Sequence, residues 1–219
     1  MKAEFEALRE RVRRAAGSML PAAGRTPPPV AEAIVRQVPR DAELVDLFCR
    51  QARLAGADAQ VVPRGALLDW LSALMDRLEA GKVLIDPATS MAAELPDRFA
   101  SRTHAAGPEL DDELMFAADL AIVSAVAGVA ETGSIVCSGG AGRRRSLSLI
   151  PPRLAAVLHA SRLVPDLFDL FAGLEAGERG ITVPGNINII TGPSHTADIE
   201  GVLVTGVHGP GQVWVAVVT

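Results

Sequence analysis

Residues 118–124 read Ala-Asp-Leu-Ala-Ile-Val-Ser, an apolar run in which Asp119 is the only charged residue. Further apolar runs follow at 133–137, 152–160, 181–190 and 213–218. Near-continuous apolar runs are typical of strands that are covered on both faces, because a strand with one wet face alternates apolar and polar residues. The second half of the chain therefore predicts a buried sheet between helices.

The first half of the chain alternates helical and strand-like patterns. Helices are predicted at 41–55, about 65–80 and 111–116, strands at 59–62 and 82–86, and a later helix at 165–176. A strand, a helix and a strand in this order indicate a parallel βαβ unit. The predicted fold class is therefore α/β, with three layers in which a mostly parallel sheet is flanked by helices.

The N-terminal region differs from the rest. Residues 3–16 predict an amphipathic helix, because Phe5, Leu8 and Val12 fall on one face. Gly17–Pro29 is rich in Gly and Pro, as in a stiff linker. We expect residues 1–29 to form a helical arm with its linker, and residues 30–219 to form a single α/β domain. The arm can dock on this domain or on a neighbouring subunit, as in a homodimer.

The composition limits the class of protein. The chain has 219 residues, 49% of them apolar and 21% charged, which is ample material for a buried core. The net charge of −5 argues against nucleic acid as a partner. No apolar run is long enough for a membrane span, and the N-terminus lacks a signal-peptide core. These features predict a cytoplasmic protein.

The cysteines bear on the cofactor. Cys49 and Cys137 are isolated and lack the spacing of a metal or iron–sulfur site. We therefore expect no iron–sulfur cluster in this chain and no covalently bound cofactor, and the sequence leaves the identity of any other cofactor open.

The loop Ser138–Arg145 has the composition of an anion-binding loop. Its glycines let backbone N–H groups face a ligand, and its arginines add charged donors. It matches neither a Walker A loop nor the GxGxxG dinucleotide pattern. The spacing alone favours a surface hairpin with solvated arginines. Among the arginines Arg145 is the best ligand-binding candidate, because the adjacent apolar run 147–150 predicts that it is partly buried.

Glu131, Thr132 and Gly133 lie between two apolar runs. A carboxylate in a turn between core strands is costly to desolvate unless it is paired. Glu131 can therefore be a general base, a nucleophile or the partner of an arginine such as Arg145. The alternative is a turn carboxylate that accepts backbone N–H groups, and the residues do not decide between these.

Residues 192–200 form the second candidate segment. Gly192 begins a turn, after which Ser194 can cap a short helix whose N–H groups suit an anion. The alternative is that Ser194, Thr196 and Asp198 only cap the turn. Asp198 can also orient Arg145 or His208, or bind a cation.

The histidines suggest two weaker hypotheses. His195, Asp198 and His208 could form a metal site, but no HxH or HExxH spacing supports one. A Ser-His-Asp hydrolase needs the elbow GxSxG, and Thr196 stands where its second Gly belongs. His208 is better explained as a residue that supports a turn or lines a pocket. We therefore predict no metal.

Together these motifs resemble the LUD domain family. The resemblance rests on residues 130–134, on Arg145 with 149–151, on 192–194 with 196–200, and on 206–210. It implies an α/β fold similar to the CoA-transferase and sugar-phosphate-isomerase group. It also implies a component of a bacterial system that oxidises L-lactate to pyruvate with iron–sulfur oxidoreductase partners, and that binds a small anionic ligand.

Two other functions stay open. One is a stand-alone CoA-transferase-like or phosphate-ligand-binding enzyme that uses Glu131 and Arg145, and the other is an assembly subunit whose motif residues are structural. The catalytic candidates are Glu131, Asp198 and His208, and the ligand-binding candidates are Thr132, Gly133, Arg145, Gly192, Ser194 and Thr196. If these residues share a site, Glu131, Arg145, Ser194, Asp198 and His208 should surround one cleft.

Overall fold

The computed structural model describes residues 2–19, 31, 35–39, 41–89, 99, 101–140, 142–177, 186–196 and 204–219. The chain forms two compact units, residues 1–36 and residues 37–219. The first contains helix α1 (Lys2–Met19), which covers the predicted helix and continues three residues further. Its side chains from Glu6 to Ala15 are exposed. Most of the predicted linker lies outside the described residues.

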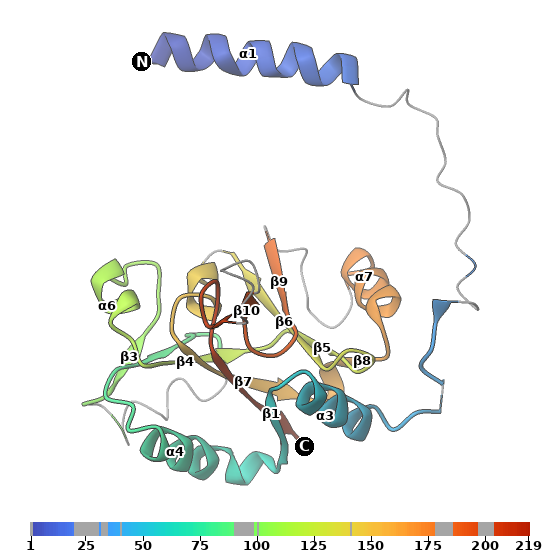
Figure 1. The fold of residues 1–219 in the computed structure, drawn as a ribbon, viewed down its shortest axis with the longest axis vertical. Helices are drawn as coiled ribbons and strands as arrows, with labels where there is room; N and C mark the ends of the chain where they lie inside the picture. Colours follow the sequence, from blue (N-terminus) through green and yellow to red (C-terminus); the bar gives the residue numbers. More distant parts are fainter. Residues whose placement is uncertain are drawn as a thin grey trace. The chain divides into compact units, whose positions relative to one another are not determined.

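A six-stranded parallel sheet forms the centre of the second unit (Figure 1). Its strands are β1 (Asp58–Val62), β2 (Val83–Ile85), β3 (Thr103–Ala105), β4 (Leu120–Ser124), β7 (Arg153–His159) and β12 (Gln212–Val218). Their order across the sheet is β1-β12-β7-β4-β2-β3. All five neighbouring pairs are parallel. The predicted α/β class and the parallel sheet are therefore confirmed.

A second sheet has four strands in the order β8-β5-β6-β9. They are β5 (Ala127–Val129), β6 (Ser134–Gly139), β8 (Leu163–Val164) and β9 (Asn186–Ile190). Strand β6 is antiparallel to both neighbours, whereas β8 is parallel to β5. A small antiparallel pair, β10 (His195–Thr196) with β11 (Val204–Thr205), follows.

Helices cover both sheets. They are α3 (Leu44–Leu54), α4 (Leu67–Arg77), α6 (Asp112–Phe116) and α7 (Leu167–Glu175), with the short 3₁₀ turns η1 (Arg64–Ala66), η2 (Arg145–Ser148) and η3 (Ala160–Arg162). Leu71 and Met75 of α4 pack on one face of the large sheet. Leu170 and Leu174 of α7 pack on the second sheet, against Val129.

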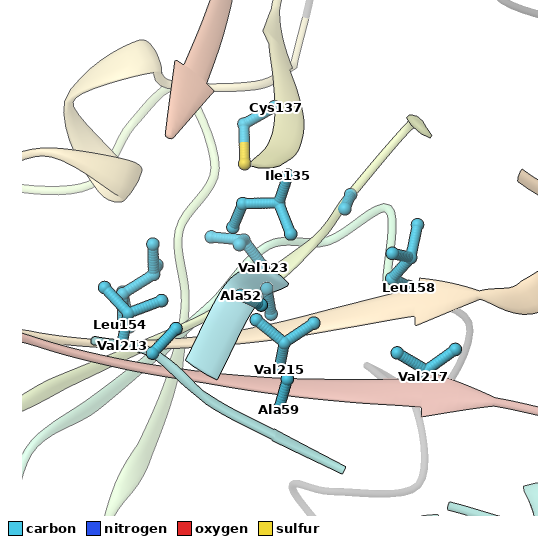
Figure 2. Packing of buried hydrophobic residues seen from close by; sticks show 14 of the residues in the cluster. Ala52, Ala59, Val123, Ile135, Cys137, Leu154, Leu158, Val213, Val215 and Val217 are labelled. Atoms are coloured by element: carbon cyan, nitrogen blue, oxygen red, sulfur yellow. The ribbon is translucent and has the colours of Figure 1, made fainter. Parts of the chain in front are cut away.

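The opposite face of the large sheet is covered by α3 and by the second sheet. Ala52 of α3 and Ile135 of β6 join one core cluster with Val123 of β4 (Figure 2). Along β7, Leu154, Ala156 and Leu158 face this cluster. The intervening Ala155 and Val157 face α4. Both faces of β7 are therefore dry, which is why its sequence is an unbroken apolar run.

The structure corrects the predicted arrangement in two respects. One side of the large sheet is covered in part by a second sheet, not by helices alone, because β5, β6 and β9 place their apolar residues between that sheet and α7. Strands β1 and β2 are parallel as predicted, but three other strands separate them. Of the run 181–190, only 186–190 is described, and it is strand β9.

Strands β2 and β4 are neighbours, and the described residues that follow them pack on opposite faces of the sheet. After β2, Phe99 packs in the cluster of α4. After β4, the chain enters the second sheet, and Ala125 and Ile135 pack in the cluster of α3. The carboxyl ends of β2 and β4 thus mark a topological switch point, where open α/β sheets usually bind their ligands.

Candidate functional site

A small pocket lies at this switch point. Asp86 directly follows β2, Ser124 ends β4, and β6 contributes Cys137 and Ser138. The other lining residues are Val123, Arg143, Arg144, Arg145, Leu147, Ser148 and Asn188. The cavity volume is about 20 Å³. That is room for roughly one water molecule.

Asp86 is the buried charge of this pocket, with 6% of the residue exposed. Its Oδ1 accepts a hydrogen bond from the backbone N–H of Ala88 at 3.0 Å. Arg143 Nε lies 3.9 Å from the same oxygen. A buried carboxylate is tolerated only with such partners, since desolvation of an isolated charge is very costly.

The three arginines of the loop have different partners. Arg143 Nη1 donates to Ser138 Oγ at 2.8 Å, and the backbone of Arg143 pairs with Gly140 across a tight turn in which Gly142 has a φ of +80°. Arg144 donates to the carbonyl oxygen of Leu110 and to Asp112 Oδ1. The loop therefore folds back and half-buries Arg143 and Arg144, whose side chains are 27% and 25% exposed.

Arg145 is exposed, so the prediction that it is partly buried is wrong. Its guanidinium group has no hydrogen bond or ion pair with any residue that the structure describes. The apolar run beside it does turn inward, but Leu147 carries the burial. Arg145 thus has no ion-pair partner among the described residues. It lines the small pocket and also an adjoining open groove, whose other lining residues are Arg144, Ser146, Leu149 and Ile150.

Hydrogen bonds anchor the turn that carries Arg145. Asn188 Nδ2 of β9 donates to Ser148 Oγ at 3.1 Å, and Ser148 Oγ donates to the carbonyl oxygen of Arg145 at 3.2 Å. Three guanidinium groups and the carboxylate of Asp86 line the pocket, and Arg144 also pairs with the exposed Asp112 outside it. This arrangement suits a small anion, with hydroxyl and amide groups available for its neutral atoms.

Cys137 is not a nucleophile in this environment. Burial raises the pKa of its thiol to about 12, with a further rise from the charge of Asp86 and an opposing effect from Arg143. The thiol is therefore protonated at neutral pH, and only a thiolate binds metal or attacks carbon. Among the described residues, no group of three His, Cys, Asp or Glu side chains has the arrangement of a metal site.

The predicted residues of the Glu131 motif lie elsewhere, in the turn between β5 and β6. Glu131 is half-buried, and its backbone N–H donates to the carbonyl oxygen of Pro165 at 2.9 Å. Its carboxylate forms no hydrogen bond or ion pair with any residue that the structure describes. Thr132 Oγ1 and Ser134 Oγ are 2.6 Å apart, and Ser134 Oγ lies 2.7 Å from Thr191 Oγ1. These hydroxyls form a chain that joins β6 to the segment after β9.

Two predicted ligand-binding glycines pack against α3. Gly133 has a φ of +66°, and a Cβ there would lie 2.0 Å from the backbone nitrogen of Ala52. Gly192 has a φ of +71°, and its Cβ would lie 2.0 Å from the carbonyl oxygen of Ala55. Both positions require glycine for the backbone conformation and for the close approach of the helix.

Ser194 does not begin a helix in this structure. Strand β10 starts at the next residue, so the predicted helix start is wrong. The backbone N–H of Ser194 donates to the carbonyl oxygen of Pro210 at 2.9 Å, and its carbonyl accepts from Gly206. Pairing with the 204–211 segment therefore replaces helical hydrogen bonds. His208, in the same segment, is exposed.

The predicted residues that the structure describes do not share one cleft. Glu131 and Arg145 lie at opposite ends of β6, whose six residues span roughly 20 Å. Ser194 and His208 belong to a segment that meets the amino ends of β7 and β12, where Gly211 bonds to Pro152. Thr196 lies in β10 beside them, and Asp198 is outside the described residues. The ion pair between Glu131 and Arg145 is not formed.

Sequence reasoning missed Asp86, Ser148 and Asn188. A signal existed for Asp86, because it is the last residue of the predicted strand 82–86, at the carboxyl end. No local signal exists for its pairing with Arg143, since the two lie far apart in the chain and meet only through the strand order. Asn188 is one of two asparagines in strand β9, whose other three residues are isoleucines.

These observations define an α/β protein with an arginine-lined pocket at the carboxyl edge of a parallel sheet. The LUD domain family model matches residues 48–218. The chain belongs to this family. No helix in the described part of the chain combines the length and apolar content that a membrane crossing requires.

Two curated relatives and one solved structure are similar to this chain. It is 34% identical to "Lactate utilization protein C" of Exiguobacterium sp. over 176 residues, which covers 78% of this chain and 76% of the relative. It is 44% identical to "Uncharacterized protein YkgG" of Escherichia coli over 97 residues, or 42% and 41% of the two chains. A crystal structure of a DUF162 family protein from Deinococcus radiodurans has the same fold, with a TM-score of 0.60, 22% identity and coverage of 87% of this chain and 100% of that one.

Proposed function

We propose that this chain is a component of a bacterial L-lactate utilisation system, in which it acts with iron–sulfur oxidoreductase subunits and binds a small anionic ligand. The assignment to this system is supported by membership of the LUD domain family and by relatives that are named lactate utilization protein C. Oxidation of lactate to pyruvate then takes place in the assembly that this chain joins.

The ligand-binding part of the proposal rests on the guanidinium group of Arg145, which has no ion-pair partner among the described residues. It stands beside two half-buried arginines, at the carboxyl edge of the sheet and next to a switch point between strands. A cation held on an anchored turn beside other positive charges attracts an anion and gives it charge-assisted hydrogen bonds.

Electron transfer is assigned to the partners. Cluster-binding sites usually need four thiolates, whereas this chain has two cysteines, and both are buried. The alternative enzyme in which Glu131 and Arg145 act together on one substrate has no support from the geometry, because β6 separates the two residues.

The first experiment is isothermal titration calorimetry of the full chain with L-lactate, pyruvate and inorganic phosphate. We expect saturable binding of at least one of these anions, and at least tenfold weaker binding by Arg145→Ala with an unchanged melting temperature. Arg50→Ala is the matched control, since Arg50 is an exposed arginine on α3. No binding by the wild type, or equal binding by Arg145→Ala, would contradict the ligand-binding part.

The second experiment tests the assembly. The tagged chain is isolated from its own cells after growth on L-lactate, and the eluate is assayed for iron, acid-labile sulfide and lactate-dependent dye reduction. We expect all three to co-elute with the chain. An eluate that holds the chain without iron would contradict the role beside iron–sulfur partners.

A further inference from the structure

We propose that Asp86 is a specificity-determining residue of the arginine-lined pocket, and that it restricts the ligand to a single negative charge. This inference rests on the anion binding proposed above and narrows the class of the ligand. The site then takes small organic monoanions and discriminates against dianions such as dicarboxylates and phosphate.

The position of Asp86 supports this role because its backbone is held on two sides. Its N–H donates to the carbonyl oxygen of Ile122 at 2.8 Å, which continues the pairing of β2 with β4. Its own carbonyl accepts from Thr89, and its carboxylate accepts from Ala88. The side chain is only 8% exposed. The negative charge therefore stays at the wall of the pocket when a ligand arrives.

Most of the charged side chains around the pocket already have a partner of opposite charge. Asp86 lies beside Arg143, and Asp112 is paired with Arg144 at 2.5 Å. Of the three pocket arginines, Arg145 is the one without a carboxylate partner among the described residues. One negative charge on the ligand pairs with Arg145, whereas a second one would approach the buried carboxylate of Asp86.

The repulsion is effective because Asp86 is buried, with its side chain 8% exposed, so little water screens its charge. The ligand is held at Arg145, where the small pocket meets the open groove. For like charges roughly 6 Å apart, at an effective dielectric constant of about 40, the repulsion corresponds to about a tenfold loss of affinity. The lining also includes the neutral hydroxyl and amide side chains of Ser124, Ser138, Ser148 and Asn188, which suit the uncharged part of a monoanion.

The test compares acetate with malonate, titrated into the full chain at about pH 8 and constant ionic strength, where both carboxyl groups of malonate are ionised. We expect the wild type to bind acetate about tenfold more tightly than malonate. In Asp86→Asn this preference disappears or reverses, whereas Asp86→Glu, which keeps the charge, retains it. Asp112→Asn is the matched control: its carboxylate is 76% exposed, so solvent screens it and the preference changes by no more than about twofold.

A second variant guards against misfolding of Asp86→Asn, which leaves Arg143 without its partner. The double variant Asp86→Asn with Arg143→Gln removes both members of the pair and leaves no lone buried charge. It should also lose the preference for acetate. Wild-type protein that binds malonate as well as acetate, or variants that keep the wild-type preference, would overturn the role of Asp86 while anion binding itself stands. Wild-type protein that binds neither these probes nor the anions titrated above would overturn both proposals.

Discussion

Replacement of Gly133 by alanine separates a packing role of the Glu131 motif from a ligand-binding role. Gly133 has a φ of +66°, and an added Cβ would lie 2.0 Å from the nitrogen of Ala52 and 2.5 Å from its Cα. Ordinary contacts are longer than 3.4 Å, so either α3 or the β5–β6 turn must shift by more than 1 Å. The structure therefore predicts a loss of stability and no direct effect on the arginine-lined pocket.

The size of the loss follows from two costs. The left-handed conformation costs an alanine roughly 1–2 kcal/mol relative to glycine. Overpacking against a buried helix backbone adds roughly 1–3 kcal/mol. Gly133→Ala should therefore lower the free energy of unfolding by roughly 2–5 kcal/mol, which is a large part of the roughly 5–15 kcal/mol that stabilises a typical domain.

The assay is urea unfolding followed by the fluorescence of Trp70 and Trp214, both within the α/β unit. Gly173→Ala in α7 is the control, because a Cβ there meets nothing within 4 Å. Alanine suits a helix better than glycine does, so this control should be as stable as the wild type or more stable by up to about 1 kcal/mol. The reasoning is refuted if Gly133→Ala unfolds at the wild-type urea concentration, and above all if it then fails to bind anions.

Two further predictions concern the pocket residues. Arg143→Ala should lower the free energy of unfolding by about 3 kcal/mol, because it leaves the buried carboxylate of Asp86 without its cation. Arg145→Ala should change the free energy of unfolding by less than about 0.5 kcal/mol, because Arg145 is exposed. Equal losses of the two variants in urea unfolding would contradict this difference in burial. Because the pKa of Cys137 is raised to about 12, its stabilising contribution is complete below pH 9 and is lost as the pH rises toward 12. The thiol then lowers the free energy of unfolding by up to about 1.4 kcal/mol per pH unit in that window. Cys137→Ala should show a smaller alkaline loss, and parallel curves for the two proteins would argue against the raised pKa.

Much of the fold follows from local sequence pattern. The apolar runs that became β4, β7 and β12 are long and uninterrupted because both of their faces are dry, and this is visible in the sequence. The helices α3, α4 and α7 show in the same way through their apolar stripes. Strands of two or three residues, such as β8 and β3, gave no such signal, because their hydrogen bonds depend on neighbours that are distant in the chain.

The candidate site was less predictable. The loop of glycines and arginines was visible as an anion-binding composition, but the arginine expected to be partly buried is the exposed one. Adjacency to the run 147–150 suggested burial for Arg145, whereas the tight turn at Gly140–Arg143 directs Arg143 toward Asp86. Side-chain direction in a loop is set by the turn geometry and by what lies across from it, and neither is a property of neighbours in sequence.

The sequence by itself determined the class of the protein, its family and the order of its main elements, because burial leaves a periodic trace in every strand and helix that it covers. Only the tertiary structure decided which strands are neighbours, that a second sheet covers part of one face, and that Glu131 and Arg145 belong to different regions. It also decided that Asp86 meets Arg143. The physical reason is that pairing between distant strands is settled by the packing of the whole core, which brings charges together without any signal in the residues beside them.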